Sequence, residues 1–185
     1  MASTLLPIPG LTALRLLPLL SSTCTLLYAR DQEFFLSLLN RPDNTRAHSK
    51  RLLPPYFRAF FRQGVVFVVA CLAVTTWGSV ANLYVSGRVL RERGAWWAYV
   101  AAATGAVGHL AFVPGVAGSI RRISEADGME EGRKEGEVDG VEGVDGVDVN
   151  AELDEWLGVN WWRMVTVDLG AWVACCVAVG RSLRA

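Results

Sequence analysis

The sequence contains few charged residues, and long stretches contain none. Asp, Glu, Lys and Arg together make up 19% of the 185 residues, whereas apolar residues make up 52%. The mean hydropathy of +0.29 agrees with this balance. Such a composition is unusual for a water-soluble domain and indicates a membrane protein. No stretch combines a basic face with interleaved aromatic residues, so we do not expect nucleic-acid binding.

Cysteine and histidine are also scarce. The four cysteines all lie within apolar stretches and form neither a CxxC pair nor a zinc-type spacing with histidine. We therefore expect them to be small buried thiols. The two histidines are His48 and His109. A site with both would require the first loop to fold back onto the third apolar stretch, so we expect no metal or haem site.

Four apolar stretches predict four membrane-spanning helices. The stretch from Gly64 to Gly87 contains no charged residue, and as a helix it would extend ~36 Å, enough to cross a hydrocarbon layer of ~30 Å. The predicted fold is therefore all-α, a four-helix transmembrane bundle that forms a single membrane domain over residues 1–185. The expected spans are about residues 8–29, 64–86, 95–117 and 160–181.

The first and fourth spans are less uniform than the other two. The first contains Arg15 and several prolines, and its alternative interpretation is a signal peptide, although a basic n-region and a cleavage site are missing. The fourth contains Arg163 and Asp168. An ionised side chain at the centre of a span costs ~2.5–3.5 kcal/mol. Asp168 therefore needs a partner or a water-filled pocket.

The long connecting segments differ in composition. The first loop, residues 30–63, places Phe34, Phe35, Leu38 and Leu39 on one helical face, as in an interfacial helix, and Phe57, Phe60 and Phe61 suggest a second. These helices would anchor the protein at the interface or form a lid. Residues 125–150 contain a degenerate repeat of Val, Gly and acidic residues, which predicts a disordered acidic insert. The spacing of its carboxylates matches no EF-hand loop.

Polar residues inside the spans define a candidate site. His109 shares a helical face with Ala101 and Gly105, so we expect it to point into the bundle. Asp168 follows Arg163 by five residues, which at ~100° per residue places it some 140° away around an α-helix. We therefore expect Asp168 to face another helix instead of pairing with Arg163, with Arg15 or His109 as its partner. The alternative is that these residues only hold the helices together.

Two segments resemble the anthrone oxygenase family of small four-span membrane proteins. They are GHLAFVPGVAGSIRRI, from Gly108 to Ile123, and WLGVNWWR, from Trp156 to Arg163. In that family a polar third span ends near a proline, and a W-x-x-x-N/H-x-x-R segment opens the last span. Trp156, Asn160 and Arg163 match this motif. The resemblance implies a cofactor-independent monooxygenase that oxidises an activated methylene of an aromatic polyketide with O₂, as in fungal secondary metabolism.

Two functional hypotheses follow. In the first, His109, Arg163 and Asp168 are catalytic, with His109 as the base, and Trp156, Asn160 and Asn82 bind a flat aromatic substrate. The roles of His109 and Asp168 are our inference and do not come from the resemblance. In the second, the chain is a non-catalytic structural or accessory multi-pass membrane protein. Its partners would then be the lipid bilayer, a second copy of the chain, or a basic protein that contacts the acidic loop.

Overall fold

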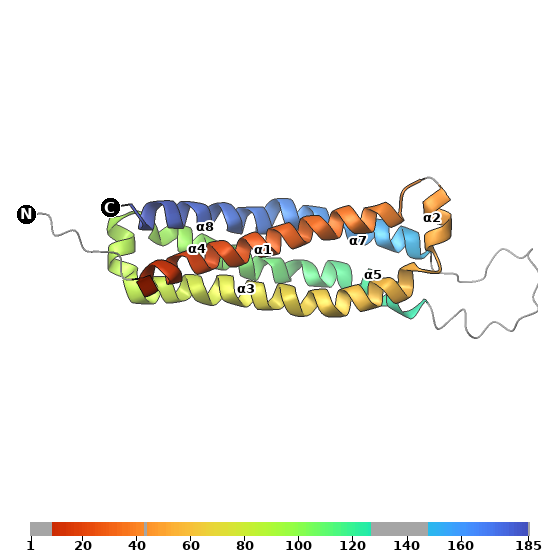
Figure 1. Ribbon diagram of the computed structural model, residues 1–185, viewed down its shortest axis with the longest axis horizontal. Helices are drawn as coiled ribbons and strands as arrows, with labels where there is room; N and C mark the ends of the chain where they lie inside the picture. Colours follow the sequence, from red (N-terminus) through yellow and green to blue (C-terminus); the bar gives the residue numbers. More distant parts are fainter. Residues whose placement is uncertain (1–8, 43, 127–147, 185) are drawn as a thin grey trace, which may run out of the picture. The chain divides into compact units, whose positions relative to one another are not determined.

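The computed structural model describes residues 9–42, 44–126 and 148–184, and the described residues are helical with no strand. The all-α prediction is confirmed. Figure 1 labels the α-helices. In chain order the elements are α1 (Pro9–Leu39), α2 (Asn44–Ser49), α3 (Leu53–Glu92), α4 (Trp96–Gly108), the 3₁₀ turn η1 (His109–Phe112), α5 (Val113–Glu125), α7 (Val149–Arg163), the π turn η2 (Met164–Asp168) and α8 (Leu169–Ser182).

Four helical stretches are long and apolar enough to cross a membrane. They are Pro9–Leu39, Leu53–Glu92, Trp96–Glu125 and Val149–Ser182. In the most apolar 18-residue segment of each stretch, only 22–28% is buried within the protein. Most of this apolar surface therefore faces outward, where lipid would cover it. The four stretches confirm the expected number and fit a multi-pass membrane protein.

The helices extend beyond the expected spans. α1 continues to Leu39 and α3 begins at Leu53, so the segments around Phe34 and Phe57 are continuous with the long helices and do not form separate interfacial helices. Residues 29–39 contain no glycine or proline that would end α1. Pro54 and Pro55 lie in the first turn of α3, where a missing N–H is tolerated. Of the predicted acidic insert, residues 127–147 lie outside the described residues.

The chain divides into two compact units. The first contains Met1–Ala29, Phe67–Ala111 and Arg163–Ala185, and the second contains Arg30–Val66 and Phe112–Trp162. The predicted single membrane domain stays a prediction, and each unit is described by itself below.

Small residues and side-chain hydrogen bonds join the helices of the first unit. Gly105 of α4 lies against α8, because a Cβ atom added there would be 3.0 Å from the Cβ of Ala171. The Ser21 and Thr75 hydroxyls of α1 and α3 lie 2.7 Å apart. The Tyr99 hydroxyl of α4 donates to the Arg15 carbonyl of α1 at 3.2 Å. Close backbone approach combined with hydrogen bonds is the usual basis of helix packing in membranes.

Replacing Gly105 by alanine is expected to destabilise the protein by about 1–3 kcal/mol, because the new methyl group overpacks the α4–α8 contact. The free energy of unfolding in detergent micelles measures this. Gly170→Ala is the matched control, since a Cβ atom at Gly170 meets nothing within 4 Å. Equal stability of the two variants would contradict a tight α4–α8 contact.

The second unit has a mixed apolar and charged character. Its core consists of Leu36, Leu53, Phe57, Ile123, Val149, Leu153, Trp156 and Leu157. Around this core lie ion pairs between Arg122 and Glu152 at 2.6 Å and between Arg46 and Asp154 at 2.8 Å. Partly exposed ion pairs of this kind are typical of an aqueous boundary.

Candidate functional site

Three of the predicted site residues meet in the interior of the first unit. The His109 Nδ1 atom lies 2.7 Å from Asp168 Oδ1, and the Arg163 Nε atom lies 3.3 Å from Asp168 Oδ2. The side chains of His109, Asp168 and Arg163 are 7%, 2% and 11% exposed. The carboxylate therefore bridges two basic groups, one on each oxygen, and we call these three residues the buried triad.

The contact between Arg163 and Asp168 corrects the sequence prediction. An α-helix would place these residues on different faces, but Met164–Asp168 form a π turn between α7 and α8. In a π turn the hydrogen bonds run from residue i to residue i+5, so positions 163 and 168 lie one above the other. The prediction that Asp168 does not pair with Arg163 was wrong because it assumed unbroken α geometry.

The contact between His109 and Asp168 depends on glycines at the end of α4. A Cβ atom added at Gly105 would lie 3.3 Å from the carbonyl oxygen of Val167. A Cβ atom added at Gly108 would lie 3.3 Å from the Cγ1 atom of the same valine. The end of α4 therefore approaches the π turn closely, and His109, the first residue of η1, reaches Asp168. The predicted inward orientation of His109 is confirmed.

Arg15 is not the partner of Asp168. Its Nη1 atom donates to the Ser182 carbonyl at 2.8 Å. Ser182 follows Asp168 by fourteen residues on one helix, which corresponds to ~21 Å. Arg15 therefore joins α1 to the C-terminal end of α8, far from the buried triad.

The geometry of the buried triad suits proton transfer at one atom of His109. When the imidazole is neutral, Nδ1–H donates to the carboxylate and the Nε2 lone pair is left as the proton acceptor. Asp168 fixes the orientation of the ring and stabilises the imidazolium that forms after proton uptake. Arg163 supplies a positive charge that compensates the buried carboxylate. A base held by a second group in this way is the common arrangement in general base catalysis.

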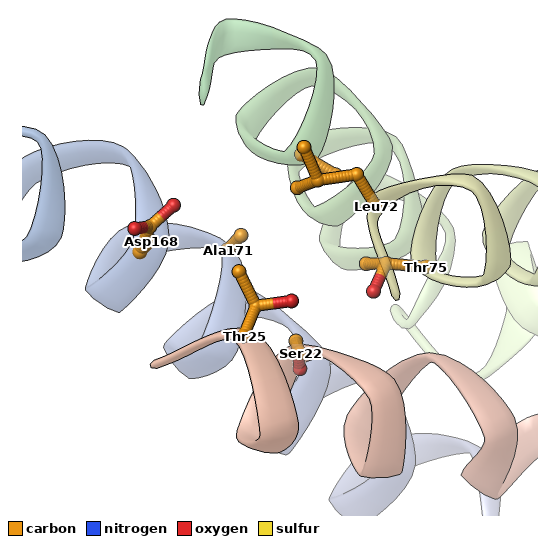
Figure 2. A pocket seen from close by; sticks show the side chains of 7 residues that line it. Ser22, Thr25, Leu72, Thr75, Asp168 and Ala171 are labelled. Atoms are coloured by element: carbon orange, nitrogen blue, oxygen red, sulfur yellow. The ribbon is translucent and has the colours of Figure 1, made fainter. Parts of the chain in front are cut away.

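A small cavity adjoins Asp168. It is lined by Ser22, Thr25, Leu72, Thr75, Ala106, Asp168 and Ala171 and has a volume of about 10 Å³. Figure 2 shows that the polar lining comes from three elements, with Ser22 and Thr25 on α1, Thr75 on α3 and Asp168 on η2. This is room for about one water molecule. Binding sites for drug-sized ligands have volumes of ~300–1,000 Å³, so a polycyclic substrate does not fit into the cavity in this conformation.

Sequence reasoning missed the hydroxyl groups around the cavity. The stripe of serine and threonine in the first span was the available signal. It did not show that Ser22, Thr25 and Thr75 would surround the same space as Asp168, because the pairing of α1 with α3 and α8 is a tertiary property.

Asn82, predicted to bind substrate, has partners within the protein. It is buried in the first unit, and its Nδ2 atom donates to the carbonyls of Leu14 at 2.7 Å and Gly78 at 2.8 Å. Its side chain thus joins α3 to α1. A role in substrate binding stays a prediction.

Trp156 and Asn160, the other predicted substrate contacts, lie in the core of the second unit. Trp156 is 3% exposed and packs edge-to-face on Phe57, with ring centroids 5.7 Å apart. Asn160 is fully buried and donates to Glu33 Oε2 at 3.0 Å. Sequence reasoning missed Glu33, a carboxylate beside two phenylalanines in α1. Both predicted residues have packing roles here, and their contact with a substrate stays a prediction.

The described residues include no group of three His, Cys, Asp or Glu side chains placed to hold a metal ion. The predicted absence of a metal and of a cofactor stays a prediction.

Comparison with known proteins finds one distant similarity. No protein-family model matches the chain, and no solved structure matches it. The chain is 27% identical to the epoxidase gkaX of Penicillium citrinum over 169 residues, which cover 91% of this chain and 94% of that protein. The similarity thus spans nearly the full length of both proteins.

Proposed function

We propose that the protein is a membrane-bound oxygenase that oxidises an activated methylene of an aromatic polyketide with O₂, the reaction of an anthrone oxygenase. The buried triad is the observation that carries this proposal. Ionisable residues within spanning helices are costly to bury and tend to mark functional sites. The distant similarity to a fungal protein named an epoxidase supports oxidative chemistry of the same broad class.

The reaction begins with proton transfer to His109. Its Nε2 atom removes a proton from a methylene group that lies between aromatic rings and opposite a carbonyl, and the carbanion is delocalised as an enolate. Asp168 stabilises the resulting imidazolium, and the positive charge of Arg163 favours negative charge nearby. These roles require no group beyond the buried triad.

Dioxygen is the oxidant in the second stage. The carbanion carbon forms a bond to one oxygen atom, and return of the proton gives a hydroperoxide. Loss of water then forms the carbonyl, so that CH₂ and O₂ become C=O and H₂O. One oxygen atom enters the product and the other leaves as water, and the substrate itself supplies all four electrons.

A non-catalytic function is the second candidate, and the small volume of the cavity favours it. In that interpretation the buried triad only fixes the packing of α4 against η2 and α8. The oxygenase proposal instead requires the helices around His109 to separate when the substrate enters from the apolar layer.

Membranes that contain the protein are expected to convert an anthrone to the anthraquinone faster than membranes without it. Under ¹⁸O₂ the new carbonyl should contain one ¹⁸O atom, which mass spectrometry of the quinone measures. A rate equal to that of empty membranes, or label that comes from H₂¹⁸O, would contradict the proposal. If the protein converted an alkene to its epoxide and did not oxidise the methylene, its activity would be epoxidation, as the name of the relative states, and the proposal would be wrong.

A further inference from the structure

Arginines gather where α3, α4 and the end of α8 meet in the first unit. They are Arg88, Arg91, Arg93, Arg181 and Arg184. Among the described residues from 83 to 100 and from 175 to 184, Glu92 is the one carboxylate. This end of the first unit therefore has a large excess of positive charge, away from the buried triad.

Three of these arginines have partners within the protein. Arg93 Nη1 donates to the carbonyls of Ser182 at 2.7 Å and Arg184 at 2.6 Å. Arg181 Nη1 donates to the Gly94 carbonyl at 2.8 Å. Arg88 pairs with Glu92 at 3.2 Å. The contacts of Arg93 and Arg181 fasten the turn between α3 and α4 to the end of α8.

The backbone of this turn requires a glycine. Gly94 has φ +66°, in the left-handed region that other residues rarely adopt. A Cβ atom there would also lie 3.3 Å from the Arg181 guanidinium that holds the turn. The turn is therefore a constrained structure, and the side chains beside it are held in place.

Arg91 is different from its neighbours. Among the described residues no oxygen or nitrogen atom pairs with its guanidinium, which lies over the Trp96 ring with its central carbon 4.7 Å from the ring centroid. Trp96 in turn packs edge-to-face on Trp97, with centroids 4.5 Å apart. Stacking on a ring leaves the N–H groups at the edge of a guanidinium available to an acceptor.

A cavity of about 250 Å³ lies beside this guanidinium. It is lined by Arg91, Gly94, Trp96 and Trp97. Trp97 is 73% exposed, and tryptophans at the end of a spanning helix typically lie at the level of the lipid headgroups. The cavity thus combines a fixed cation, an aromatic wall and a position at the membrane boundary.

We propose that this cavity binds the phosphate group of an anionic membrane lipid. A guanidinium matches a phosphate with two parallel charge-assisted hydrogen bonds, and basic pockets at the ends of spans recognise lipid headgroups in this way. The excess of arginine around the cavity attracts the anion. The tryptophans contact the glycerol and the upper acyl carbons, which a free phosphate ion lacks. This site is independent of the proposed oxygenase activity.

The test measures lipid binding to the purified full-length protein. Native mass spectrometry counts bound lipids, and the unfolding temperature is recorded in nanodiscs of phosphatidylcholine with or without phosphatidylglycerol. Phosphatidylglycerol is expected to raise the unfolding temperature of the wild type. Arg91→Ala should lose most of this rise and bind phosphatidylglycerol about tenfold more weakly, because the charge-assisted hydrogen bonds are removed.

Arg88→Ala is the matched control, since it removes the same charge one turn away but does not line the cavity. It should keep the rise. If Arg88→Ala and Arg91→Ala lost the rise in unfolding temperature equally, the cause would be a general effect of surface charge, and the proposal would be overturned. A rise produced by inorganic phosphate in detergent, and lost in Arg91→Ala, would overturn the assignment to a lipid. If Arg91→Ala does not fold, Trp97→Ala serves instead, and unchanged lipid binding in that variant would equally overturn the proposal.

Discussion

Replacing His109 by alanine is expected to lower the catalysed rate of anthrone oxidation by about 10²–10⁴-fold, the usual contribution of a positioned general base. The reason is that the imidazole, held through Nδ1 by Asp168 at 2.7 Å, still has its Nε2 lone pair to accept a proton, whereas both oxygens of the Asp168 carboxylate already accept hydrogen bonds from His109 and Arg163. Carboxylate and guanidinium remain in the variant, but neither replaces the imidazole at the substrate carbon. Quinone formation above the spontaneous rate in the same membranes is the measurement.

His48→Ala is the matched control for this variant. It removes the other histidine of the chain, which lies in α2 of the second unit, and it should retain the wild-type rate. Added imidazole should partly restore the rate of His109→Ala, because the substitution leaves space beside Asp168. A structural role for His109 does not predict such rescue. Wild-type activity in His109→Ala would remove His109 from the mechanism.

Replacing Asp168 by alanine is expected to destabilise the protein by about 3–5 kcal/mol. The carboxylate is 2% exposed and touches both Arg163 and His109. Its removal leaves the guanidinium of Arg163 buried with its carboxylate partner lost, and breaking a buried pair from one side has a cost of this size. The free energy of unfolding in detergent micelles measures the effect.

The double variant Arg163→Met, Asp168→Ala separates the cost of removing the carboxylate alone from the value of the pair. Removing both charges and restoring apolar volume is expected to recover part of the stability that Asp168→Ala loses. Strict additivity of the two single substitutions would contradict a direct interaction between these side chains.

The same variants distinguish the two candidate functions. An oxygenase loses turnover in Asp168→Ala even at temperatures where the variant is folded, because His109 loses the group that orients its ring. A non-catalytic bundle loses only stability in this variant. It has no turnover above the spontaneous rate, so no substitution can lower it. Measuring both quantities on one set of purified proteins therefore decides between the functions.

The long apolar stretches by themselves determined the four helices. A predominantly apolar run that is long enough to cross the hydrocarbon layer has few other stable conformations, because every backbone polar group must be bonded within the segment. The orientation of His109 also followed from the sequence. Gly105 marks a face of the third span on which another helix approaches, and His109, one turn further on, lies on that face and is buried, whereas Ala101 is exposed.

The requirement of Asp168 for a partner was also evident in the sequence, because an unpaired carboxylate within a span is too costly. The identity of its partners was decided only by the tertiary structure. The π turn from Met164 to Asp168 aligned Arg163 with Asp168. Such a turn contains one more residue than an α-helical turn, and a prediction based on the α-helical period of 3.6 residues cannot show where this extra residue occurs.

Tertiary structure likewise decided which polar residues surround the site. Trp156, Asn160 and Arg163 follow one helical spacing in the sequence, yet Trp156 and Asn160 are buried among the side chains of the second unit, whereas Arg163 pairs with Asp168 in the first. Helical spacing shows which residues share a face. Which neighbour covers that face depends on contacts between segments far apart in the chain, and those contacts are a property of the packed helices.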